Sequence, residues 1–319
     1  MKALVVSALS PDLSGTALAD VPEPQEAAGK VLIRVRAAAL NYPDLLMTRG
    51  EYQLKPPLPF TPGMEVAGQV LAGDGFAPGT AVVAGTRLGG LADVVAVDAA
   101  AVRALPPHLS FAQGAAVGAA YLTAYVALVR LGALRPDEWL LVHGATGGVG
   151  LAAVDLAHAL GARVIATSRS PEKLATLAAD YPVAATLPAP GFRDAVKELT
   201  GGGADMVFDP VGGDVFDEST RCIAFGGRLL VVGFTSGRIA TVSTNMPLIK
   251  GFSVIGVRAG EYGRRFPDRG RENLDAIWSL AASGRILPRV HAEYPLADWR
   301  AAFDTMARSD MVGKLILVP

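Results

Sequence analysis

The stretch Leu140-Leu141-Val142-His143-Gly144-Ala145-Thr146-Gly147-Gly148-Val149-Gly150 decides the fold of this 319-residue chain. Apolar residues that suit a buried strand lead into a glycine-dense turn, and an apolar helical pattern follows over 150–160. Glycine lets the backbone approach a pyrophosphate, and a helix N-terminus offers unpaired N–H groups. A second strand, 163–167, follows within about 30 residues, as a dinucleotide-binding fingerprint requires. A structural turn in another doubly wound protein, such as a methyltransferase, is the alternative.

The residues after the second strand indicate which nucleotide binds. Residues 166–170 lack the Asp or Glu with which an NAD site binds the ribose diol. They provide Ser168 and Arg169 instead, and Lys173 lies one turn into the next helix. A hydroxyl and two cations suit a 2′-phosphate, so the sequence favours NADPH over NADH. The alternative is an ordinary solvated helix start.

The rest of the chain contains two kinds of sequence. Residues 1–110 contain short alternating segments punctuated by Pro-Gly and Gly-Asp-Gly turns, which are typical of a β-rich, barrel-like unit. From about residue 138, strands alternate with helices, which indicates an α/β, doubly wound parallel sheet of the Rossmann type. We therefore predict a β-rich domain over 1–115 and 285–319, and a nucleotide-binding domain over 116–284.

Composition and charge exclude several classes of protein. With 51% hydrophobic and 18% charged residues the chain is not intrinsically disordered. Its 29 basic and 30 acidic residues create no field for nucleic acid or an anionic membrane. The one cysteine, Cys222, excludes an internal disulfide. We find no signal-peptide pattern and no uninterrupted apolar run of about 20 residues, so we expect a cytoplasmic protein without a nucleic-acid or membrane partner.

Further motifs surround the glycine-rich turn: Asn41-Tyr42-Pro43-Asp44, Gly50-Glu51-Tyr52, and the segments 58–68, 121–125, 209–213 and 313–315. Together they cover essentially the whole chain and resemble the medium-chain dehydrogenase/reductase superfamily, most closely its zinc-free, zeta-crystallin-like quinone oxidoreductase branch. The resemblance implies a GroES-like catalytic domain, a Rossmann domain and an active-site cleft between them. It also implies hydride transfer from NADPH to a quinone or an α,β-unsaturated carbonyl (enone or enoyl) substrate.

The positions that bind zinc in zinc-dependent relatives differ in this chain. Met64 stands where those relatives place a histidine, and no cysteine lies near Asn41. The histidines at 108, 143, 158 and 291 are scattered. Without thiolate or imidazole ligands a tetrahedral zinc site does not form, so we predict a zinc-independent enzyme.

The resemblance also indicates site residues. The predicted catalytic residues are Asn41, whose amide could bind the ribose or a substrate carbonyl, and Tyr42 and Tyr52, with Tyr52 preferred for stabilising an enolate or donating a proton. Asp44 would border the nicotinamide or, alternatively, cap the helix that follows it. The predicted cofactor-binding residues are Asn41, Asp44, Thr123, Ala145, Thr146, Gly147, Gly148, Val149, Gly150, Ser168, Arg169, Lys173, Gly233, Phe234, Thr235, Val257 and Arg258.

Two other functions stay open: a zinc-independent alcohol or ketone oxidoreductase, and a non-catalytic NADPH-binding protein like the crystallin relatives. The apolar, β-branched segment 252–257 predicts a homodimer, because in relatives this edge strand pairs with its twofold mate.

Overall fold

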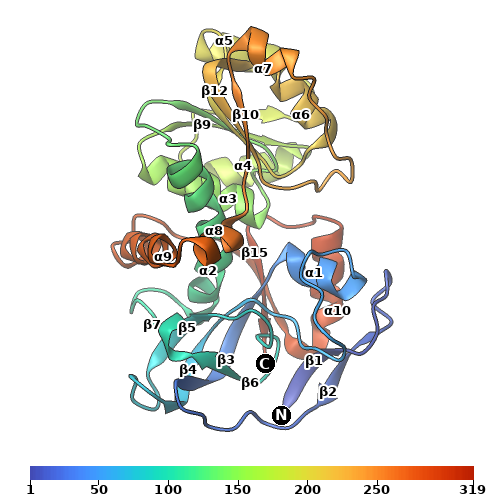
Figure 1. Cartoon of the computed structure of the whole chain (residues 1–319), viewed down its shortest axis with the longest axis vertical. Helices are drawn as coiled ribbons and strands as arrows, with labels where there is room; N and C mark the ends of the chain where they lie inside the picture. Colours follow the sequence, from blue (N-terminus) through green and yellow to red (C-terminus); the bar gives the residue numbers. More distant parts are fainter. The chain divides into compact units, whose positions relative to one another are not determined.

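The computed structural model describes residues 1–319, which form two compact units. Unit 1 comprises Met1–Ala119 and Pro288–Pro319, and unit 2 comprises Ala120–Leu287. Unit 2 is therefore inserted into the sequence of unit 1, as the colours of Figure 1 show. The division predicted from the sequence lies a few residues away, at 115/116 and 284/285.

Unit 2 contains a six-stranded parallel sheet. Its strands are, in spatial order, β10 (Ala185–Pro188), β9 (Arg163–Ser168), β8 (Trp139–Val142), β11 (Ala204–Asp209), β12 (Ile223–Val231) and β13 (Ser253–Gly256). Numbered along the chain, this order is 3-2-1-4-5-6, that of the Rossmann sheet, with the switch point between β8 and β11. The predicted α/β Rossmann fold is confirmed.

The helices of unit 2 lie on the connections between these strands (Figure 1). They are α3 (Gly148–Ala159), α4 (Pro171–Asp180), α5 (Arg193–Thr200), α6 (Gly213–Ser219) and α7 (Asn245–Lys250), while α8 (Ala259–Arg265) and α9 (Pro267–Ala282) follow β13, the last strand of the sheet. Helix α6 ends at Ser219. The chain turns there because the Ala204 N–H donates to Cys222 O at 2.9 Å, which begins the pairing of β11 with β12.

One long apolar helix, α2 (Phe111–Tyr125), runs from unit 1 into unit 2 and continues as a π-helical stretch to Leu131. By length and composition alone, Phe111–Leu131 is sufficient to cross a membrane. More than half of its most apolar window is buried, and buried core helices of water-soluble proteins pass the same test. The helix is therefore weak evidence for a membrane span.

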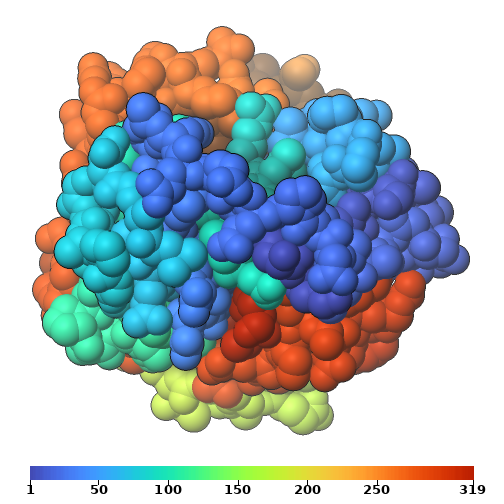
Figure 2. Space-filling view, turned by 90° about the horizontal axis from the view of Figure 1, so that it is seen from below, coloured from blue at the N-terminus to red at the C-terminus, as the bar shows by residue number.

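Unit 1 contains a seven-stranded sheet and a two-stranded ribbon. The sheet order is β14 (Val290–Pro295), β15 (Lys314–Val318), β3 (Lys30–Leu40), β4 (Glu65–Gly73), β5 (Ala81–Gly85) and β7 (Val102–Ala104), with β6 (Val94–Asp98) also paired to β3; β1 (Lys2–Val6) and β2 (Thr16–Asp20) form the ribbon. The C-terminal strand β15 pairs antiparallel with β3, so both chain ends lie in this unit and on the face shown in Figure 2.

The core of unit 1 explains the alternation seen in β3. Val31, Ile33 and Val35 are buried in an apolar cluster with residues of β4 and β15, whereas Arg34 and Arg36 are exposed. Helices α1 (Tyr42–Arg49) and α10 (Trp299–Ala307) complete the unit, with 3-10 turns at Ala99–Ala101 and Leu296–Asp298. This β-rich unit is the predicted GroES-like domain.

Candidate functional site

The glycine-rich turn leaves backbone N–H groups unpaired at the start of α3. The first helical N–H that bonds back is that of Leu151, which donates to Gly147 O at 2.8 Å. The N–H groups of Gly148, Val149 and Gly150 have no partner, and no side chain caps the helix. Because such groups carry the positive end of the helix dipole, they form a ready anion-binding site at the carboxyl end of β8.

Gly150 and Gly147 of this turn have different surroundings, so a side chain at each position would meet different obstacles. A Cβ at Gly150 would lie 2.3 Å from the Gly144 oxygen, so the helix packs directly on the turn and leaves no room for a side chain. A Cβ at Gly147 would meet nothing closer than the same oxygen, at 3.4 Å. Its φ of −78° and ψ of 163° suit any residue. The protein does not fill the space beside Gly147, which is therefore open to a ligand.

The other residues predicted at this turn line the ends of β8 and β9. Ala145 is buried, and its N–H donates to Thr167 O at 3.0 Å. The hydroxyls of Thr146 and Ser168 lie 3.4 Å apart. Arg169 is exposed and has no hydrogen-bond or ionic partner. An unpaired guanidinium therefore follows a strand end at which the Ser168 hydroxyl bonds Thr146 and accepts the Ser170 N–H.

The start of α4 holds the third predicted phosphate ligand, Lys173, together with an acid that we did not single out. The Ser170 hydroxyl accepts the Lys173 N–H at 3.2 Å and donates to Glu172 Oε2 at 2.7 Å. This hydrogen bond lowers the pKa of Glu172, so its carboxylate is ionised at neutral pH. Lys173 is partly buried. One oxygen of the Glu172 carboxylate is thus bonded to Ser170.

The remaining predicted cofactor residues of unit 2 lie at the carboxyl ends of β12 and β13. Thr235 donates to Pro210 O through both its N–H and its hydroxyl, each at 3.1 Å. Phe234 is exposed and stands beside Gly212, where a Cβ would lie 3.1 Å from its ring, and Gly233 precedes it. The Val257 N–H donates to Val231 O at 2.9 Å, and exposed Arg258 begins α8. The structure therefore gathers these residues on the same sheet edge as the glycine-rich turn, whereas Thr123 lies on α2.

Two buried polar residues under this edge have structural roles. His143 is fully buried, which lowers its pKa to about 3, and it lies between Thr167 and Ser219 at 2.8 and 2.7 Å. The Ser219 hydroxyl donates to Val215 O, so His143 Nε2 carries the proton and donates to Ser219. Asp209 accepts the N–H groups of the loop after β11 through Oδ1, while its buried Oδ2 has no partner and burial raises its pKa.

In unit 1, Asp44 fastens the start of α1. Its Oδ2 accepts the Asn41 N–H at 2.8 Å, and its Oδ1 accepts the Gly63 N–H at 2.9 Å. The side chain is fully buried, and burial raises its pKa to about 6, against the lowering effect of these hydrogen bonds and of Lys314. Of the two roles considered from the sequence, the helix-capping one matches these contacts. The expected position of Asp44 beside the nicotinamide stays a prediction.

The Asn41 amide is also occupied by the protein. Its Nδ2 donates to Ala39 O at 3.2 Å and to Glu65 Oε1 at 2.9 Å, and its Oδ1 accepts from Lys314 at 2.7 Å. The residue is 6% exposed. The amide therefore binds a buried ion pair that the sequence did not predict, and its expected hydrogen bond to a ribose or a substrate stays a prediction. Glu65 and Lys314 both lie in motifs that we quoted, but nothing local indicates that they meet.

The two predicted tyrosines retain free hydroxyls. Tyr42, the first residue of α1, is 39% exposed, and its hydroxyl has no partner. Tyr52 is partly buried against a small apolar cluster of Val6, Met47 and Phe60, and its hydroxyl is likewise unpaired. Unit 1 therefore offers two phenols near α1 whose hydroxyls make no hydrogen bond within the protein.

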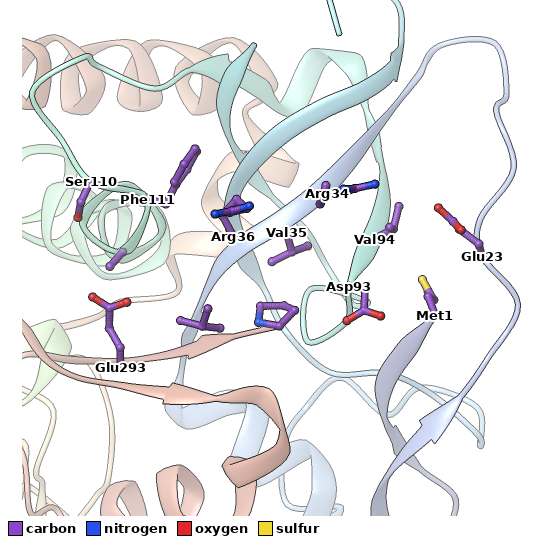
Figure 3. Close-up of a pocket in the computed structure, with 13 residues that line it drawn as sticks. Met1, Glu23, Arg34, Val35, Arg36, Asp93, Val94, Ser110, Phe111 and Glu293 are labelled. Atoms are coloured by element: carbon purple, nitrogen blue, oxygen red, sulfur yellow. The ribbon is translucent and has the colours of Figure 1, made fainter. Parts of the chain in front are cut away.

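A separate cavity of about 760 Å³ opens on unit 1, away from these tyrosines. Figure 3 shows Arg34 and Arg36 of β3 in its wall, with the carboxylates of Glu23, Asp93 and Glu293 around them. It contains none of the predicted site residues. Because it mixes two cations with three anions, it presents no field of one sign, and we assign it no role.

Comparison with known proteins identifies the family. Residues 27–107 match the model of the alcohol dehydrogenase GroES-like domain, and residues 148–278 match that of the zinc-binding dehydrogenases. The chain is 35% identical over 305 residues to quinone oxidoreductase-like protein 2 homolog of Nematostella vectensis. The matched region covers 90% of this chain and 81% of that protein.

Two solved structures have the same fold over the whole chain. A probable oxidoreductase from Mycobacterium abscessus superposes with a TM-score of 0.89 at 38% identity, covering 100% of this chain and 99% of that one. The quinone oxidoreductase from Thermus thermophilus, also solved in complex with NADPH, superposes with a TM-score of 0.87 at 33% identity, covering 100% of both chains. The chain belongs to the medium-chain dehydrogenase/reductase superfamily of oxidoreductases, and within it to the quinone oxidoreductase branch. The family predicted from the motifs is confirmed.

The residues do not fit the zinc ion that the description of one family model implies. No three His, Cys, Asp or Glu side chains lie together in an arrangement that could hold a metal ion. Cys222 is buried, and burial raises the pKa of its thiol to about 12, so it supplies no thiolate ligand near neutral pH.

Proposed function

We propose that this protein is an NADPH-dependent, zinc-independent reductase that transfers hydride to a quinone or an α,β-unsaturated carbonyl compound. The observation that carries the proposal is the set of three unpaired N–H groups at the start of α3, at the switch point of a Rossmann sheet. A pyrophosphate is the ligand that such a site binds in doubly wound proteins. The NADPH complex of the Thermus relative and the names of the relatives support the same choice.

The polar groups at β9 favour the 2′-phosphorylated cofactor. The Arg169 guanidinium is unpaired, and Ser168 adds a hydroxyl at the end of the same strand. Guanidinium and phosphate make strong, charge-assisted hydrogen bonds. The only acid nearby in sequence, Glu172, is held by Ser170. We therefore place the 2′-phosphate at Ser168, Arg169 and Lys173.

The tyrosines of unit 1 supply the second half of the chemistry. When bound, a nicotinamide would supply the hydride, and the substrate oxygen would gain negative charge. The Tyr52 hydroxyl, which is unpaired in the protein, donates a hydrogen bond to that oxygen, and Tyr42 offers a second donor. Since no metal-binding cluster is present to polarise the oxygen, these donors carry the electrostatic stabilisation.

We also propose that the protein is a homodimer built on β13, the edge strand of the Rossmann sheet. Apolar side chains are exposed on and beside this edge: Val254 at 38%, Phe225 at 88%, Leu248 at 81% and Ile249 at 72%. An apolar, unpaired strand edge is a site for association with a second copy. Light scattering should give twice the mass of the chain; a monomer at micromolar concentration would contradict this proposal.

Oxidation of NADPH tests the catalytic proposal. The absorbance of the reduced nicotinamide is followed with a panel of quinones, enones, enoyl thioesters, ketones and aldehydes, with and without a chelator. We expect turnover of quinones or activated double bonds that the chelator does not change. Turnover of ketones alone would indicate an alcohol or ketone oxidoreductase, and binding of NADPH without any turnover would indicate a non-catalytic protein.

A further inference from the structure

A buried ion pair lies against the residue that precedes α1. The Lys314 ammonium donates to Glu65 Oε1 at 3.0 Å and to Asn41 Oδ1 at 2.7 Å. The Asn41 Nδ2 donates to the same Glu65 oxygen at 2.9 Å, which closes a triangle of hydrogen bonds. The Lys314 and Glu65 side chains are only 6% and 4% exposed. No substrate therefore contacts this pair directly.

The triangle joins segments that are far apart in the chain. Asn41 follows β3, Glu65 begins β4 and Lys314 begins β15. The second Glu65 oxygen accepts the Ala119 N–H of α2 at 2.7 Å. A Cβ at Gly118 would lie 2.7 Å from this oxygen, so the glycine lets the carboxylate reach the helix backbone. Four elements of unit 1 are thus held at one point.

The triangle also fixes the direction of the Asn41 amide. A cation faces its oxygen and an anion faces its nitrogen, so a reversed amide would bring donor against donor. The Asn41 backbone is fixed as well, because its N–H donates to Asp44. Asn41 is the N-cap of α1 and immediately precedes Tyr42. These contacts therefore fix the start of α1 and the direction in which the Tyr42 side chain extends from the backbone.

Stability alone does not explain a buried ion pair at this place. Two well-packed apolar side chains of similar volume often stabilise a core as well or better, because charges lose hydration on burial. A hydrogen-bonded network of paired charges instead fixes the orientation of each of its side chains. Here the network orients the Asn41 amide. Asn41 directly precedes Tyr42, whose hydroxyl we place at the substrate.

We propose that Lys314 and Glu65 are positioning residues for the reduction: through Asn41 they hold the start of α1, and with it the Tyr42 hydroxyl, in its orientation toward the substrate. The proposal rests on the proposed reductase function. It predicts that the ion pair affects turnover but not the affinity for the nucleotide, because the predicted nucleotide site on the glycine-rich turn belongs to unit 2.

Two variants separate positioning from folding. Lys314→Met leaves the Glu65 carboxylate buried and unpaired, so we expect a lower melting temperature and a kcat reduced by at least about tenfold. Lys314→Met/Glu65→Gln removes both charges; it should recover much of the stability, whereas kcat stays low because Asn41 has lost its cation. The NADPH dissociation constant should stay within about twofold of the parent value in both. Lys314→Arg, which keeps a cation and N–H donors, should retain more kcat than Lys314→Met.

The double variant decides the question. If it regains the parent kcat together with stability, or if Lys314→Met turns over at the parent rate, the ion pair is only structural and the proposal is wrong. Gly118→Ala covers the case in which the Lys314 variants do not fold. It favours the helix intrinsically but pushes against the Glu65 carboxylate, so kcat should fall with a smaller loss of melting temperature than in Lys314→Met.

Hydrogen exchange gives a readout that does not depend on the reaction. In Lys314→Met or Gly118→Ala, the amides at the start of α1 should exchange faster than in the parent, while those at the start of α3 should not change. If the parent protein lacks reductase activity, the proposed function fails and exchange still reports whether the pair holds α1. Unchanged exchange at α1 in both folded variants would overturn the positioning role.

Discussion

Replacing the glycines of the turn one at a time separates folding from nucleotide binding. Gly147→Ala adds a methyl group whose closest contact is 3.4 Å, at a backbone conformation that alanine adopts freely. Alanine reduces the entropy of the unfolded chain, which stabilises by about 0.4–1 kcal/mol. It is a poorer N-cap than glycine by a similar amount, so the stability should change by less than about 0.5 kcal/mol.

Binding should respond quite differently to the same methyl group. It would stand in front of the unpaired N–H groups of α3 and hold the pyrophosphate away from them. Each hydrogen bond to a charged group contributes about 1.5–3 kcal/mol, so the loss of one such bond predicts NADPH binding weaker by about tenfold or more. Calorimetric titration with NADPH and thermal unfolding of the same samples measure both quantities.

Gly150→Ala is the opposite case. Its methyl group would lie 2.3 Å from the Gly144 oxygen, so the turn must move. We expect a steric cost of about 3 kcal/mol, offset by about 1 kcal/mol of better helix propensity, and hence a melting temperature lower by several degrees. Gly85→Ala, in open space in unit 1, is the matched control and should change neither quantity. If Gly147→Ala binds NADPH as the parent does, the pyrophosphate does not lie at this turn.

Three further predictions concern single groups. Tyr52→Phe should lower kcat by about tenfold or more, and by more for enones than for quinones, with little change in NADPH affinity. If both substrate types react at the parent rate, the Tyr52 hydroxyl does not stabilise the substrate oxygen. Arg169→Ala/Lys173→Ala should weaken NADPH binding by about 2–4 kcal/mol in titrations and barely change NADH binding, and equal losses would contradict the 2′-phosphate site. His143, whose pKa is lowered from 6.5 to about 3, takes up its proton on unfolding, so stability falls as pH decreases through that window. Between pH 7 and 5 the parent should lose about 2 kcal/mol relative to His143→Gln in denaturant unfolding, and parallel curves would exclude this role.

The Rossmann half of the protein could be predicted because its signals are local. The strand, the four glycines and the apolar start of α3 are contiguous in the sequence, and each requires the same turn. Ser168 and Arg169 follow the next strand directly, so their place at the sheet edge follows from the parallel connection. The family motifs then extended the prediction to the GroES-like unit.

The roles of Asn41 and Asp44 could not be predicted in this way. Lys314 lies 273 residues from Asn41 in the chain, and only the pairing of β15 with β3 brings the two together. Asp44 depends on the Gly63 N–H, which comes from a loop without regular structure. Both residues suit a ligand by chemical type, and the sequence does not show which of their polar atoms the protein itself contacts.

In the proposed function, the unpaired N–H groups at the start of α3 and the Arg169 guanidinium after β9 bind NADPH. Calorimetric titration of the parent protein with NADPH and then with NADH tests it most directly. We predict one NADPH per chain, bound at least about tenfold more tightly than NADH, because Ser168, Arg169 and Lys173 would contact the 2′-phosphate that only NADPH carries. Absence of NADPH binding, or equal affinity for the two nucleotides, would contradict this account.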